Sequence, residues 1–151
     1  MTHVSEGDQR LDDDSPEAGR YDRATVKAVG KLTEALETLE VARGHLYQFH
    51  RMTGTTDFAV GEAVDLLREA GHHDLADRIA AELVGRNVLP GRWTFQVVED
   101  FDDTYYQPFR ALEERARELT GGQRHLFEAE LKRARRSRGV AGHEATPGEV
   151  R

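Results

Sequence analysis

Hydrophobic and polar positions recur with the period of an α-helix along most of the chain, most clearly from Arg92 to Leu119. Successive helical residues turn by about 100°, so eight residues of this stretch, seven of them apolar, fall within about 100° of arc. They are Thr94, Val98, Phe101, Tyr105, Phe109, Leu112, Ala116 and Leu119. A face of this width predicts one long helix in a helical bundle. Pro108 lies inside the pattern and predicts a kink rather than an end.

The remaining periodic segments predict further helices, separated by turn signals. We expect helices over 22–52 and 58–70, a third from His72 to the loop at 87–91, and a last one over 123–136. The segment TGTTD at 53–57 supplies possible N-caps and predicts a turn. No segment has the pattern of a strand. The sequence therefore predicts an all-α fold, an antiparallel helical bundle of four main helices plus a C-terminal helix.

Length and charge distribution predict one domain between two tails. The chain has 151 residues, enough for one domain with its own core. Residues 1–20 carry six acids against two bases with almost no apolar content, which predicts a disordered acidic tail. Residues 139–151 contain Gly and Pro without periodicity and predict a second disordered tail. The helical bundle is expected over 21–138.

Composition excludes several classes of function. The net charge of −7 disfavours general nucleic-acid binding, because neutralising phosphates needs a positive surface. The absence of cysteine removes disulfides and thiolate chemistry. No apolar run approaches the roughly 20 residues of a membrane span, and the acidic N-terminus does not resemble a signal peptide. We expect a cytoplasmic protein that does not associate with membranes.

Polar residues interrupt or flank the apolar faces of three predicted helices. They are Arg43, Tyr47 and His50 on the first helix, Arg86 at the end of the third, in line with Ile79, and Glu99, Asp102 and Tyr106 on the long one. In an up-down bundle the first and fourth helices are neighbours, and buried charges are tolerated only when paired. We therefore expect His50 and Asp102 to be largely buried, and Arg43, His50 or Arg86 to contact Glu99 or Asp102.

This polar row has two interpretations. It is either a buried network that sets helix register or the lining of a ligand site, and a metal site would use His50, Glu99 and Asp102. No P-loop, nucleophile elbow or His-Glu-x-x-His motif is present, and no cofactor is expected. The leading hypothesis is a binding module for a small molecule or a protein. The alternative is a metal-binding protein or enzyme, and the oligomeric state is left open.

Trp93 is the only tryptophan and follows the Pro-Gly turn at 90–91. A tryptophan buries a large area when it closes the end of a bundle. We expect Trp93 to anchor the junction before the long helix, and we count it among the candidate ligand-binding residues.

Three segments carry a resemblance to other proteins. They are ARGHLYQFHRMTG at 42–54, AELVGRNVLPGRWTFQVVEDFDDTYY at 81–106 and RHLFEAELK at 124–132. Over about two thirds of its length the chain resembles a group of short actinobacterial proteins of unknown function. The Arg-rich composition agrees with such an origin. The resemblance implies no activity, ligand or catalytic residue.

Overall fold

The computed structural model describes residues 20–144 of the chain, and every regular element in this range is helical. α2 spans Arg23–Glu69, α3 His73–Glu82, α4 Thr94–Phe101, α5 Gln107–Arg117 and α6 Leu126–Arg135. A π-helical turn, Asp102–Tyr106, joins α4 to α5, and a 3₁₀ turn, Glu118–Thr120, follows α5. The all-α prediction is confirmed. The antiparallel bundle remains a prediction, and residues 1–19 and 145–151 of the expected tails lie outside the described range.

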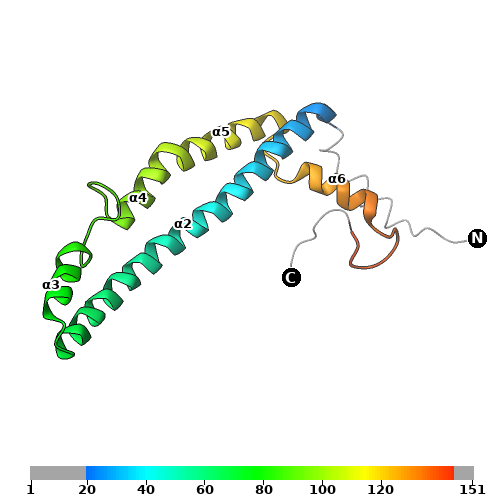
Figure 1. Cartoon of the computed structure of the whole chain (residues 1–151). Helices are drawn as coiled ribbons and strands as arrows, with labels where there is room; N and C mark the ends of the chain where they lie inside the picture. Colours follow the sequence, from blue (N-terminus) through cyan, green and yellow to red (C-terminus); the bar gives the residue numbers. More distant parts are fainter. Residues whose placement is uncertain (1–19, 145–151) are drawn as a thin grey trace, which may run out of the picture. The chain divides into compact units, whose positions relative to one another are not determined.

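The turn predicted at 53–57 is wrong, because α2 is one helix of 47 residues that continues through it (Figure 1). The hydroxyl groups of Thr55 and Thr56 donate to the carbonyls of Arg51 and Met52, one helical turn earlier, at 3.1 and 2.8 Å. These side chains therefore bond back along the helix instead of capping a new one. Gly54 reduces helix propensity but does not stop the helix.

Pro108 has the effect expected of a proline that does not end a helix. The backbone N–H of Gln107 bonds to the carbonyl of Asp102, five residues earlier, so the helix is π-wound just before Pro108. Proline has no N–H to donate and crowds the preceding turn, which favours such a local departure. The helix then resumes as α5.

The chain divides into two compact units, Met1–Leu36 with Arg110–Arg151, and Glu37–Phe109. In the first unit, Glu113 is buried and its carboxylate accepts from Thr33 Oγ1 at 2.8 Å and from Arg117 Nε at 2.9 Å. Thr120, which is also buried, ends the 3₁₀ turn, and Tyr21 lies against Gly121. This unit is fixed by buried polar contacts as well as by Val26 and Val29.

In the second unit, Glu37–Phe109, the buried apolar residues are Val64, Ala76, Val98 and Tyr106. They come from α2, α3, α4 and the π turn, so each of these elements contributes one residue to the core. This core is small for the length of α2. Within residues 20–144, no helix is both long and apolar enough to cross a membrane.

Candidate functional site

An ion pair joins α2 to the π turn in the second unit. Arg43 donates to Asp102 through two parallel hydrogen bonds, Nε to Oδ1 at 2.7 Å and Nη2 to Oδ2 at 2.8 Å. The side chains of Arg43 and Asp102 are 24% and 20% exposed, so the predicted contact is confirmed but the pair is half-buried rather than buried. The hydrogen bonds from Arg43 lower the pKa of Asp102, and those to Asp102 raise the pKa of Arg43. Such two-point pairing fixes orientation as well as distance.

Two tyrosines enclose this pair. The guanidinium carbon of Arg43 lies 4.5 Å from the ring centroid of Tyr106 and 4.9 Å from that of Tyr47, at cation–π distance. The buried Tyr106 donates its hydroxyl to Glu40 at 2.6 Å. We call Glu40, Arg43, Tyr47, Asp102 and Tyr106 the Arg43 network. Within it, Arg43 bonds to Asp102, Tyr106 bonds to Glu40, and both tyrosine rings contact the guanidinium. This is the arrangement of a structural connection.

His50 does not join this network. Its Nδ1 lies 2.7 Å from Thr94 Oγ1, at the first residue of α4, and the ring is half-buried. Its partner is a hydroxyl rather than the expected carboxylate, because α4 begins at this level and Asp102 lies two turns further along. His50 therefore positions the start of α4 on α2.

Glu99 is exposed, and in the described part of the chain it forms no hydrogen bond or ion pair with Arg43, His50 or Asp102. Among residues 20–144, no group of three His, Cys, Asp or Glu side chains is placed to hold a metal ion. The candidate metal set of His50, Glu99 and Asp102 is thus separated into three environments. The three residues therefore form no shared metal site in the described part of the chain.

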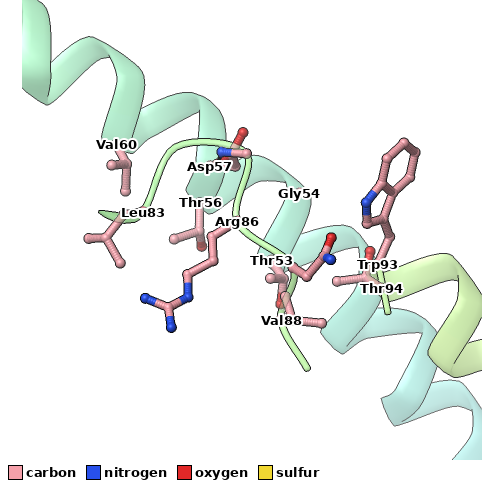
Figure 2. A pocket seen from close by; sticks show the side chains of 12 residues that line it. Thr53, Gly54, Thr56, Asp57, Val60, Leu83, Arg86, Val88, Trp93 and Thr94 are labelled. Carbon is pink, nitrogen blue, oxygen red and sulfur yellow. Dashed lines mark hydrogen bonds between the residues drawn. The ribbon is translucent and has the colours of Figure 1, made fainter. Parts of the chain in front are cut away.

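A pocket of about 520 Å³ opens beside the His50–Thr94 contact, between the middle of α2 and the loop that precedes α4. Its lining comprises Thr53, Gly54, Thr56, Asp57, Val60, Leu83, Gly85, Arg86, Asn87, Val88, Trp93 and Thr94 (Figure 2). Two of the eight predicted site residues, Arg86 and Trp93, lie here. The other ten were not among the predicted site residues.

One hydrogen bond ties the pocket loop to α2. The backbone N–H of Gly85 donates to Asp57 Oδ1 at 2.8 Å, and Gly85 has a left-handed φ of 70°. The sequence offered Asp57, together with Thr55 and Thr56, as a possible N-cap after the expected turn. Since α2 is continuous at this point, its carboxylate instead accepts from a residue 28 positions away.

Arg86 is exposed, and in Figure 2 its side chain extends away from the α2 ribbon. Its Nη1 donates to the carbonyl of Glu82 at 3.3 Å. In the part of the chain that the structure describes, no carboxylate forms an ion pair with it. Arg86 therefore keeps its positive charge and most of its N–H groups directed to solvent.

Trp93 does not anchor the fold as expected, because 60% of its surface is exposed. Its ring meets the edge of Phe95, with centroids 5.4 Å apart and planes at 79°. Its backbone N–H donates to Gln96 Oε1 at 3.0 Å, so the main chain of Trp93 starts α4 while the indole is left at the pocket. The side chain is consequently available to a ligand.

Comparisons with protein-family models, curated proteins and solved structures found no significant match for this chain. The resemblance to short actinobacterial proteins stays a prediction.

Proposed function

We propose that the protein is a non-catalytic binding module, and that its pocket takes a small molecule with an acidic group and a flat apolar part. The observation that carries this proposal is that Arg86, which forms no ion pair within residues 20–144, lines the same pocket as the exposed Trp93. A guanidinium is suited to carboxylates and phosphates, and an indole to flat apolar groups. The pocket volume of about 520 Å³ is typical of small-molecule sites.

The other lining residues fit a ligand with one polar and one apolar part. Val60, Leu83 and Val88 offer apolar surface, while Asn87 adds an amide that can donate and accept. We infer that α2 and α4 run antiparallel in this unit, since His50 meets Thr94 whereas Arg43, earlier in α2, meets the later Asp102. The Arg43 network then serves as the structural support of the binding site.

A pair of matched probes tests the proposal. The fluorophore 1-anilinonaphthalene-8-sulfonate combines a flat apolar body with an anion, and N-phenyl-1-naphthylamine has the same body without the charge. We expect Arg86→Ala to weaken binding of the sulfonate about tenfold, the effect of losing one charge-assisted hydrogen bond. The neutral probe should bind the variant as it binds the wild type.

Two further variants complete the experiment. Trp93→Leu should weaken both probes, because both use the flat surface. Arg78→Ala removes an exposed arginine of α3 that pairs with Glu82, outside the pocket, and should change neither affinity. Equal binding of the sulfonate by Arg86→Ala and by the wild type would overturn the proposed site.

A further inference from the structure

A face of α2 that carries no charged side chain lies exposed in the second unit. At about 100° per residue, Val41, His45, Met52, Ala59, Ala63 and Leu66 share one side of the helix, and all six are exposed. We call them the outer stripe. The uncharged Gln48 and Thr55 occupy the intervening turns. The stripe is about 38 Å long at 1.5 Å per residue.

The inward side of α2 is a different set of residues. Arg43, His50, Asp57 and Val64 carry the contacts and burial described above, and they lie about 140° or more around the helix from the middle of the stripe. Charged residues make up 32% of the whole chain, so a solvated face of seven turns would be expected to carry several. A long uncharged strip with exposed apolar side chains is typical of an interaction surface.

The distribution of side-chain size along the stripe indicates what covers it. Met52, with Phe49 at its edge, makes the N-terminal half bulky, whereas Ala59 and Ala63 make the C-terminal half shallow. In a parallel alignment of two copies, the bulky half of one stripe would face the bulky half of the other, and a gap would be left between the alanines. Two antiparallel copies related by a two-fold axis place each bulky half on the shallow half of the other, and such complementary packing is what helix interfaces require.

The charges beside the stripe match the same arrangement. Arg51 and Glu62 lie on one flank of it, about 16 Å apart along the helix. In the described part of the chain neither forms an ion pair. A two-fold axis near residues 55 and 56 brings Met52 opposite Ala59 of the second copy and Arg51 close to its Glu62. Both ion pairs then form between copies, by symmetry.

We propose that the outer stripe of α2 is a self-association surface on which a second copy of this chain docks antiparallel, with Arg51 of each copy paired to Glu62 of the other. None of the six stripe residues lines the pocket, although Thr56, beside the expected two-fold axis, does. The proposal does not depend on the proposed ligand.

The first test measures mass in solution with the full chain. Sedimentation equilibrium over a wide concentration range should show a dimer for the wild type and a monomer for Met52→Glu, at concentrations where the wild type is dimeric. Leu112→Glu is the matched control, because Leu112 and Met52 are both 64% exposed and Leu112 lies on α5. The control should remain dimeric. A wild type that is monomeric throughout, or a dimer that Met52→Glu leaves intact, would overturn the proposal.

Charge reversal tests the partner assignment. Arg51→Glu and Glu62→Arg should each raise the dimer dissociation constant severalfold, and the double variant should restore it toward the wild-type value. Since the two residues are 11 positions apart on one helix, restoration can arise only between copies. A double variant that is no tighter than either single variant would refute the pairing.

Cysteine crosslinking tests the register, and the chain contains no native cysteine to interfere. Thr55→Cys lies next to the expected two-fold axis and should form an intermolecular disulfide under mild oxidation. Leu66→Cys alone should not form an intermolecular disulfide. The double variant Leu66→Cys with His45→Cys should form one, because the two positions face each other across the axis. Efficient crosslinking by Leu66→Cys alone would contradict the antiparallel register.

Discussion

Arg43 and Asp102 show how strongly a single pair of residues is specified by local chemistry. The two-point contact between them, with Tyr106 against the guanidinium, holds the π turn on α2 in the second unit. The sequence predicted that Arg43, His50 or Arg86 would contact Glu99 or Asp102, because charges on or beside an apolar face need a partner. It did not predict Glu40, which looks like an ordinary exposed acid until Tyr106 is placed beside it.

The first prediction concerns this pair. Asp102→Asn should lower the free energy of unfolding by about 1–3 kcal/mol at neutral pH, because it replaces charged hydrogen bonds by neutral ones. Denaturant unfolding measures the difference. Asp103→Asn, at an exposed neighbour, should cost less than about 0.5 kcal/mol. Equal stability of Asp102→Asn and the wild type would show that the pair contributes nothing.

The pH dependence of this effect follows from the lowered pKa of Asp102. The folded carboxyl has a lower pKa than the unfolded one, whose usual value is about 3.9. Its contribution is therefore fully present above that value and is lost as the pH falls through the folded pKa. We expect the stability difference between the wild type and Asp102→Asn to narrow below about pH 4.

Gly121 carries a second prediction at the scale of one residue. Its φ is 66°, and a Cβ there would collide with the hydroxyl of Tyr21. Gly122 has a φ of 74° but open space around it. Gly121→Ala should therefore destabilise the protein more than Gly122→Ala, by about 1–2 kcal/mol beyond the shared cost of the left-handed backbone. Thermal unfolding of the two variants measures the difference, and equal losses would contradict it.

At the scale of elements, α2 shows where sequence patterns succeed and fail. Its apolar period correctly predicted helix on both sides of residues 53–57, but Gly and Thr in TGTTD also fit a turn. Local composition alone cannot decide between these, since threonine hydroxyls bond equally well to a cap or to the preceding turn. The outcome depends on tertiary contacts such as Asp57 with Gly85, between residues far apart in sequence. The pocket was missed for the same reason.

Gly54→Ala tests the continuity of α2. In the middle of a helix, alanine is favoured over glycine, and a Cβ at this position meets nothing within 4 Å. The variant should gain about 0.5–1 kcal/mol in unfolding free energy. Gly71→Ala, where φ is 87°, should instead lose stability because a left-handed backbone is strained for alanine. Loss of stability in Gly54→Ala would indicate that the helix is interrupted there.

At the scale of the whole molecule, the division into two compact units predicts that a destabilising substitution in one unit promotes local unfolding mainly in that unit. Glu113→Gln leaves the side chain of Arg117 unpaired in a buried setting, and we expect a local loss of about 2–4 kcal/mol. Hydrogen exchange should accelerate at least tenfold around Thr33 and Thr120, and little around the His50–Thr94 contact. Asp102→Asn should instead accelerate hydrogen exchange around the His50–Thr94 contact, and little around Thr33 and Thr120. Uniform acceleration by either variant would mean that the units open together.

The contact between Asp57 and Gly85 has a consequence for how this protein can vary. The donor that ties the pocket loop to α2 is the main-chain amide of Gly85, so this bond requires no particular side chain at 86–88. Those three residues line the pocket. If the pocket is the proposed binding site, exchange of Arg86, Asn87 or Val88 changes the preferred ligand while the anchoring bond is kept. The loop then separates the evolution of specificity from the maintenance of the fold.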